Sequence, residues 1–172
     1  MRAALKAAGF NSKAVSVSHR SSGYSDAWNV TIRQQGISKR QIEDIVYQFE
    51  YIRWDEHCQE ILEGCNDFVF VDKTAAAEGG EEFREAVQAA VDFHHSPEHE
   101  DGCGRNIAGT DWVLFYDSGF HRFDLWNSNE AADYSVRDVH GINDWQDVAE
   151  SISKIIYARN LDIEYLNKKK LA

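Results

Sequence analysis

Apolar and polar side chains alternate over residues 14–20 and again over residues 28–33. Alternation with a period of two predicts half-buried β-strands. The segment SSGYSD between them is rich in turn formers, so the pair is predicted to form a hairpin. A short helix is predicted over residues 1–9, before this hairpin. Gly9 provides the signal that ends the helix.

Three later segments have apolar residues spaced three and four apart, which predicts helices. The first helix begins after Ser38, which forms a capping-box motif with Gln41, and extends to about Phe49. The second helix is predicted over residues 81–94. The last one begins at Asn143 and ends near residue 156, and a short strand and a basic tail are expected in residues 161–172.

Further strands are predicted at residues 57–62 and 68–72, and a second hairpin joins residues 112–116 and 120–126. Residues 74–80 are expected to be a linker, and residues 95–109 and 127–141 irregular. The resulting fold class is α+β. An αββαββ unit over residues 1–73 is followed by an αββα unit over residues 74–172, with mixed or antiparallel sheets, helices packed on one side, and the two units separate or joined in one continuous domain.

The composition, with 43% hydrophobic and 12% aromatic residues, suffices for a buried core. The apolar runs are too short for a transmembrane helix, and the N-terminal segment lacks the apolar region of a signal peptide. Cys58, Cys65 and Cys103 are too few and too irregularly spaced for a disulfide framework, so reduced thiols and a cytoplasmic location are expected.

Charge is unevenly distributed along the chain, whose formal net charge is −11. Residues 1–40 contain seven Lys or Arg and one Asp, whereas residues 41–102 contain three basic and 17 acidic residues. Residues 103–172 contain eight basic and 11 acidic residues. An acidic surface of this kind attracts basic grooves and repels phosphate, or serves solubility alone.

Two residue clusters contain side chains of the types found in metal or catalytic sites. His94, His95, His99 and Cys103 have side chains that bind zinc, but structural zinc sites usually combine two separated pairs. A solvated loop is the favoured interpretation, so no metal site and no other cofactor is expected.

Ser118, His121 and Asp124 have the residue types of a catalytic triad. His121 and Asp124 are separated by an odd number of positions, so they would lie on opposite faces of a strand. The chain also lacks the glycine-rich motifs that bind phosphate. The sequence therefore predicts a protein that is not an enzyme.

The basic N-terminal part favours an alternative in which the chain binds nucleic acid directly, with cations on phosphates and aromatic rings on bases. It could equally pair with the acidic remainder of the molecule. The residues predicted for this nucleic-acid face are Arg20, Tyr24, Trp28, Arg33, Lys39 and Arg40.

The segments MRAALKAAGF, SVSHRSSGYSDAWNVTI, QIEDIVYQFEYI and EILEGCNDFVFV resemble the large polyvalent protein-associated domains of phages and other mobile elements. The resemblance covers residues 1–73 and implies no catalytic residues. It implies a mobile-element protein acting inside a bacterium, where small acidic proteins often inhibit CRISPR effectors or restriction enzymes.

The leading hypothesis is therefore a non-enzymatic inhibitor, of anti-CRISPR type, that mimics DNA and binds a basic, nucleic-acid-processing host enzyme such as a Cas nuclease. No membrane partner is expected. The acidic residues predicted to bind the partner are Glu43, Asp44, Glu50, Asp55, Glu56, Glu60, Glu63, Glu81, Glu82, Glu85, Glu98, Glu100 and Asp101.

Overall fold

The computed structural model describes residues 1–21, 23–55, 57–62, 64–94, 96, 103–119, 122–127, 136–139 (backbone only) and 148–171. The chain forms two compact units, which we call unit 1 and unit 2. Unit 1 comprises Met1–Gly79 and Asn160–Ala172, and unit 2 comprises Gly80–Arg159. The sequence had assigned all of residues 74–172 to one unit. The structure differs because the end of the chain forms hydrogen bonds with a helix of unit 1, as described below.

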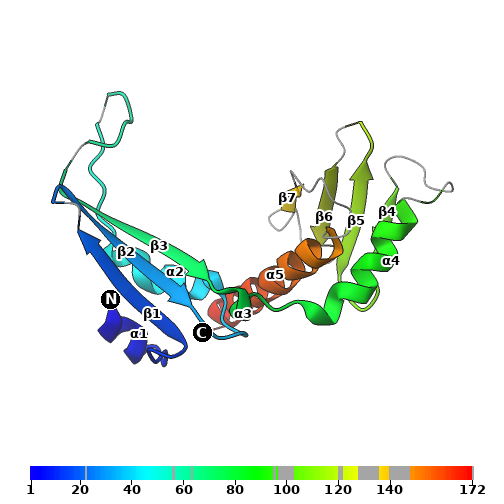
Figure 1. Cartoon of the computed structure of the whole chain (residues 1–172), viewed down its shortest axis with the longest axis horizontal. Coiled ribbons are helices and arrows are strands. Elements are labelled where there is room, and N and C mark those ends of the chain that lie inside the picture. Colours follow the sequence, from blue (N-terminus) through cyan, green and yellow to red (C-terminus); the bar gives the residue numbers. More distant parts are fainter. Residues whose placement is uncertain are drawn as a thin grey trace. The chain divides into compact units, whose positions relative to one another are not determined.

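Unit 1 contains a three-stranded mixed sheet with the order β1-β2-β3 (Figure 1). β1 (Val15–Ser21) and β2 (Ser25–Ile32) form the predicted antiparallel hairpin, and β3 (Asn66–Lys73) runs parallel to β2. The helical segments of unit 1 are α1 (Arg2–Ala7), α2 (Lys39–Val46), the 3-10 helix η1 (Tyr47–Phe49), α3 (Ala75–Glu78) and the end of the last helix, from Asn160 onward. The predicted α+β class is confirmed.

The strand predicted at residues 57–62 is not formed, so the predicted αββαββ order is wrong. In residues 57–62 the described backbone makes no strand, and the described residues of the 50–65 segment form two isolated bridges, Tyr51 with Asp67 and Trp54 with Ile61. The positive φ of Gln59 at 58° interrupts any regular extended run there. β3 instead pairs with β2 after a crossover through α2, as parallel strands require.

The core of unit 1 lies between one face of this sheet and the helices α1 and α2. Its members include Leu5 of α1, Val30 of β2 and Ile42 of α2, all 3% exposed or less. The predicted cap of α2 is confirmed, because Ser38 Oγ accepts a hydrogen bond from the Gln41 backbone N–H at 3.1 Å. One face of the sheet is therefore buried, and the other is left for solvent.

Unit 2 begins with the 3-10 helix η2 (Glu81–Phe83) and α4 (Arg84–His94), where the sequence predicted a helix. Its antiparallel sheet has the order β4-β5-β6-β7. β5 (Trp112–Asp117) and β6 (Arg122–Asn127) form the predicted hairpin, whereas β4 (Gly104–Asn106) and β7 (Val136–Val139) were not predicted. The predicted αββα order is therefore wrong, because it lacks these two short flanking strands.

The last helix, α5 (Val148–Lys170), extends through residues 161–170, where a strand was predicted. Asp162, Tyr165 and Lys169 recur three and four residues apart, and each bonds to α2 or its cap. Contacts made at helical spacing therefore explain why this segment is a helix and not the predicted strand. No helix among the described residues has both the length and the apolar content that crossing a membrane requires.

Candidate functional site

The solvent side of the unit 1 sheet is the first candidate site, and we call it the open face. Val15, Val30 and Val71 point into the core, so the alternate positions of each strand point outward. Ser18 and Arg20 on β1 and Phe70 on β3 are exposed there. The open face comprises Ser16, Ser18, Arg20, Ala27, Asn29, Thr31, Phe68, Phe70 and Asp72.

Two stacked aromatic rings occupy the β3 side of the open face. The ring centroids of Phe68 and Phe70 are 6.3 Å apart, with 23° between the ring planes. Phe70 is 50% exposed, although burying a phenylalanine side chain would stabilise the fold. The strand register places Phe68 beside Ala27 and Phe70 beside Asn29. The rings therefore form an apolar platform next to a small side chain and an amide.

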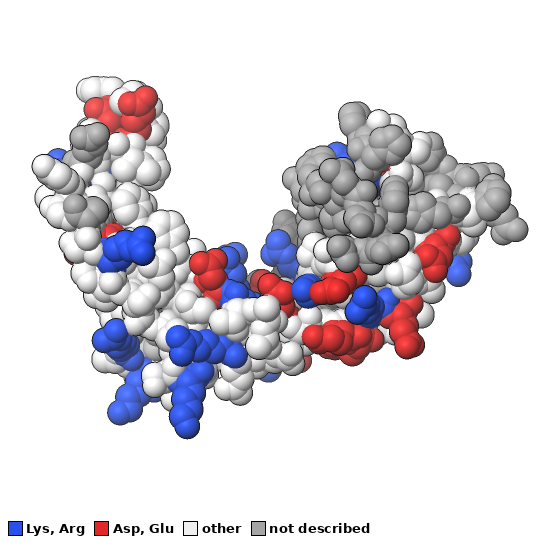
Figure 2. Space-filling model, in the orientation of Figure 1, with Lys and Arg blue, Asp and Glu red and all other residues white. Residues whose placement is uncertain are grey.

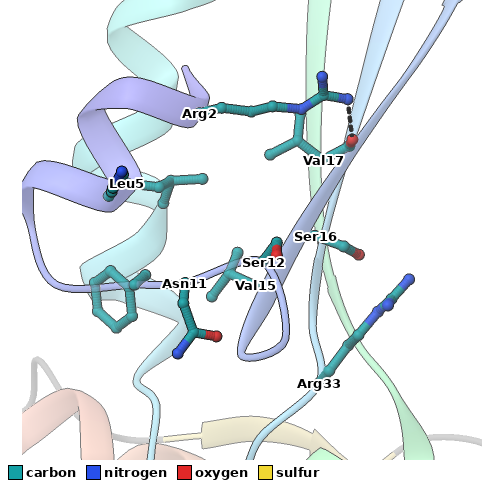
Figure 3. Close-up of a pocket in the computed structure, with 10 residues that line it drawn as sticks. Arg2, Leu5, Asn11, Ser12, Val15, Ser16, Val17 and Arg33 are labelled. Atoms are coloured by element: carbon teal, nitrogen blue, oxygen red, sulfur yellow. Dashed lines mark hydrogen bonds between the residues drawn. The ribbon is translucent and has the colours of Figure 1, made fainter.

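The second candidate site is a groove of about 680 Å³ between α1 and β1, which we call the α1–β1 groove (Figure 3). Arg2 and Lys6 of α1 and Arg33, which follows β2, are among the residues that line it. The Arg2 guanidinium donates a hydrogen bond to the Val17 carbonyl at 2.8 Å. The complete lining is Arg2, Leu5, Lys6, Phe10, Asn11, Ser12, Val15, Ser16, Val17 and Arg33, with no carboxylate.

The six residues predicted for the nucleic-acid face do not form one surface. Arg20, Tyr24 and Arg33 are exposed, Tyr24 to 83%. Trp28 points to the inner side of the sheet, where it packs on the core and against the His19 ring at 4.3 Å between centroids. The register therefore places Trp28 on the core side of the sheet, away from the side that exposes Arg20, and its stacking role stays a prediction.

Lys39 and Arg40 lie on α2, which covers the opposite face of the sheet. Lys39 Nζ is 3.8 Å from Glu43, and Arg40 Nε is 4.0 Å from Asp44, one helical turn away. Lys169 Nζ also bonds Asp44 Oδ2, at 2.7 Å. These pairs show that the α2 part of the acidic set is balanced by cations of the same unit.

Asp44 joins α2 to the end of α5. Its carboxylate accepts hydrogen bonds from Lys169 Nζ and from the Tyr165 hydroxyl, the latter at 2.8 Å. The Lys169 bond is the main reason that the pKa of Asp44 lies below its usual value, with the Tyr165 bond and the charges of Lys169 and Arg40 adding to it. The Asp44 carboxylate is thus occupied by hydrogen bonds within unit 1.

Of the remaining unit 1 carboxylates of the predicted acidic surface, Asp55 and Glu60 are neighbours, because the Asp55 backbone N–H donates a hydrogen bond to the Glu60 carbonyl at 2.8 Å. Glu50 Oε1 accepts the backbone N–H of Val69 at 3.1 Å, at the side of β3 that does not face β2. Asp55 accepts the N–H groups of His57 and Cys58, which lowers its pKa. Glu60 is exposed in the 50–65 segment. Glu56 and Glu63 lie outside the described residues.

In unit 2 the acidic residues of the prediction are grouped. Glu81, Glu82 and Glu85 are all exposed on η2 and the start of α4, where acidic side chains gather in Figure 2. Unit 2 contains six Lys or Arg and 16 Asp or Glu, a net charge of −10, while unit 1 contains 12 and 13, a net charge of −1. Glu98, Glu100 and Asp101 lie outside the part of the chain that the structure describes.

The candidate zinc cluster is not assembled by its two described members. His94 is 3% exposed, and its Nε2 lies 3.0 Å from the Leu114 carbonyl oxygen, so it belongs to the core of unit 2. Cys103 is exposed, and His95 and His99 are outside the described residues. No group of three metal-ligating side chains occurs among the residues described.

The candidate triad has one member, His121, outside the described residues. Ser118 is exposed in the β5–β6 turn, and Asp124 forms an ion pair with Arg122 at 3.3 Å. Cys58, Cys65 and Cys103 are free and exposed. The described geometry therefore brings together no nucleophile, base and orienting group.

Phe68 and Phe70 were absent from the predicted site. The available signal was the unbroken apolar run FVFV at residues 68–71, which gives a strand two apolar faces. Val69 and Val71 fill the core side, so the phenylalanines must lie outside.

Comparisons with protein-family models, with curated proteins and with solved structures gave no match to this chain. The resemblance of residues 1–73 to the polyvalent-protein domains therefore remains a prediction.

Proposed function

We propose that unit 1 binds single-stranded nucleic acid on its open face. The observation that supports this most is the stacked pair Phe68 and Phe70, of which Phe70 is solvent-exposed, on a sheet that also exposes Arg20. Bases of any sequence stack on aromatic side chains, and each stacked base contributes about 1–3 kcal/mol. Protein sheets recognise unpaired bases in this way because bases of a single strand can be splayed out.

The charges of unit 1 fit this proposal better than the overall net charge suggests. The chain has no carboxylate before Asp26, and the cations in that part include Arg2, Lys6 and Arg20. In Figure 2 the Lys and Arg side chains gather over α1 and the adjoining β1. Phosphates could lie along this basic side while bases reach β3, since adjacent strands are about 4.8 Å apart.

The test measures binding of fluorescent single-stranded DNA and RNA oligonucleotides by anisotropy at low salt. Phe70→Ala is expected to weaken binding by about 1–3 kcal/mol, because one base loses its stacking partner. Arg20→Ala is expected to weaken binding less at high salt than at low salt, because its contribution is electrostatic. Trp126→Ala removes a 41% exposed aromatic residue of unit 2 and serves as the matched control.

The proposal fails if the wild-type chain does not bind either oligonucleotide. It also fails if Phe70→Ala binds as tightly as Trp126→Ala. A duplex of the same sequence is expected to bind more weakly, because paired bases cannot reach the rings.

A second candidate function is supported by unit 2. Its net charge of −10 and the exposed Glu81, Glu82 and Glu85 favour an acidic surface that binds a basic partner protein, as an inhibitor of a nucleic-acid-targeting defence enzyme would. Changing all three to Gln should slow association with guide-loaded Cas nucleases and reduce its salt dependence. Unchanged association, or no binding by the wild type, would exclude this surface.

A further inference from the structure

We propose that the α1–β1 groove binds a phosphate group. This inference rests on the proposed function and deepens it, because the phosphate would come from the single strand whose bases stack on the open face. A free phosphorylated small molecule offers the same chemistry, so the experiment below distinguishes the two sources.

Three cationic residues from two separate elements line this groove. Arg2 and Lys6 are four residues apart and so share one side of α1, and Arg33 directly follows the last residue of β2. An arginine has five N–H donors in a planar fork that matches phosphate oxygens. The bond from Arg2 to the Val17 carbonyl uses only part of this fork and fixes the guanidinium at the edge of the groove.

The groove itself provides no competing anion. Its ten lining residues include no Asp or Glu, and no ion pair within 4.0 Å is found for Arg2, Lys6 or Arg33 among the described residues. Arg2 also borders a neighbouring cavity that contains Asp26 and Asp67. Asp26 is already engaged by His19, whose Nε2 is 3.3 Å away. The positive charge of the groove therefore remains available to a ligand.

The uncharged part of the lining strengthens this attraction and adds hydrogen-bond donors. Leu5, Phe10 and Val17 supply apolar walls, and a cleft of one charge sign with such walls concentrates the electric field. Asn11 Oδ1 accepts the backbone N–H groups of Lys13 and Ala14, so the polar group that remains to Asn11 is its donor amide. The volume of about 680 Å³ lies within the range of small-molecule sites.

The position of the groove explains why a strand is the expected source of the phosphate. Ser16 of β1 belongs both to the groove and to the open face, and β1 is an edge strand of the sheet. A nucleic-acid strand with bases on the open face can therefore continue over β1 and place a backbone phosphate between α1 and Arg33.

The experiment first follows the Nε–Hε signals of arginine by NMR while inorganic phosphate is added at constant ionic strength, with chloride as the reference anion. Saturable shifts are expected for Arg2 and Arg33 and not for Arg159, an exposed arginine of unit 2. The double variant Lys6→Ala, Arg33→Ala should abolish the saturable shift of Arg2. Lys13→Ala, which removes an exposed cation outside the groove lining, should leave it unchanged.

The second measurement is the salt dependence of oligonucleotide binding. The double variant should reduce the slope of log K against log salt by about 0.7, the value for one phosphate contact on a single strand. Phe70→Ala should lower affinity without changing this slope. Arg2 is left intact in these variants because its bond to Val17 contributes to the fold.

The two proposals fail separately. An unchanged slope together with no saturable phosphate shift overturns the groove while oligonucleotide binding still supports the open face. Saturable phosphate binding without oligonucleotide binding supports the groove, overturns the strand as its source, and points to a free phosphorylated ligand.

Discussion

Unit 1 and unit 2 differ in both charge and exposed apolar surface. Unit 1 is nearly neutral, with a net charge of −1, whereas unit 2 has a net charge of −10. Eight of the nine exposed large hydrophobic residues described belong to unit 1, and Trp126 alone belongs to unit 2. The strongly acidic net charge of the chain therefore belongs almost entirely to unit 2, and most of the exposed large hydrophobic residues described belong to unit 1.

The largest effects are expected from a matched pair of core substitutions that tests whether the units are independent. Ile42 in unit 1 and Ile152 in unit 2 are both fully buried. Truncation of either to Ala should reduce the free energy of unfolding by about 2–5 kcal/mol, through lost burial and a cavity. Hydrogen exchange should accelerate in β1–β3 for Ile42→Ala and in β5 and β6 for Ile152→Ala. Identical exchange changes in both variants would show that the units unfold together.

A pair of glycine substitutions sharpens the comparison at the start of unit 2. Gly80 has a φ of +100°, and a Cβ added there would lie 2.6 Å from the Ser153 carbonyl oxygen. Gly80→Ala should therefore destabilise the protein by about 2–4 kcal/mol, from left-handed backbone strain and overpacking together.

Gly36 in unit 1 is the control, since its φ is +78° and no atom lies within 4 Å of an added Cβ. Gly36→Ala should cost only the backbone strain, about 1–2 kcal/mol. Urea denaturation measures both variants. Equal losses of stability would show that the close approach of Gly80 to Ser153 is relieved without cost.

The smallest effect concerns the carboxylates that unit 1 neutralises internally. The pKa of Asp44 is lowered in the folded state, chiefly by the hydrogen bond from Lys169. A lowered folded pKa means that this stabilisation is complete above the ordinary Asp pKa of about 4 and is lost as the pH falls through the lower folded pKa. Asp44→Asn should cost about 1 kcal/mol at pH 7 and progressively less below pH 4.

Glu164→Gln is the matched control for Asp44→Asn. Glu164 pairs with Lys168 at 3.4 Å, but both side chains are largely exposed, so the pair should contribute little. Thermal unfolding of both variants from pH 7 to pH 3 measures the difference. A pH-independent loss in Asp44→Asn would contradict the role assigned to the carboxylate charge.

Local patterns predicted those elements that local interactions form. The β1–β2 hairpin has alternating residues and a turn-rich loop, and α2 has its cap at Ser38. The failures occurred where distant contacts decide the structure. β3 pairs with β2 in parallel after a long excursion, and residues 161–170 remain helical where Asp162, Tyr165 and Lys169 reach α2 or its cap.

The candidate site was predictable only in part for a similar reason. The sequence indicated the basic N-terminal part, and Arg20, Tyr24 and Arg33 are indeed exposed. It did not indicate which aromatic residues face outward, because the face of a strand depends on its register with neighbouring strands. This register points Trp28 inward and Phe70 outward.

The sequence by itself determined the α+β class, the capped helix, the two hairpins and the total charge, because composition and short-range periodicity are local properties. Only the tertiary structure decided how that charge divides between the units, which carboxylates meet Lys39, Arg40 and Lys169, and which side of the sheet remains open. These properties depend on pairs of residues that can be more than a hundred positions apart, such as Asp44 and Lys169. A short window of sequence, such as one used to recognise a helix or a strand, cannot contain both members of such a pair.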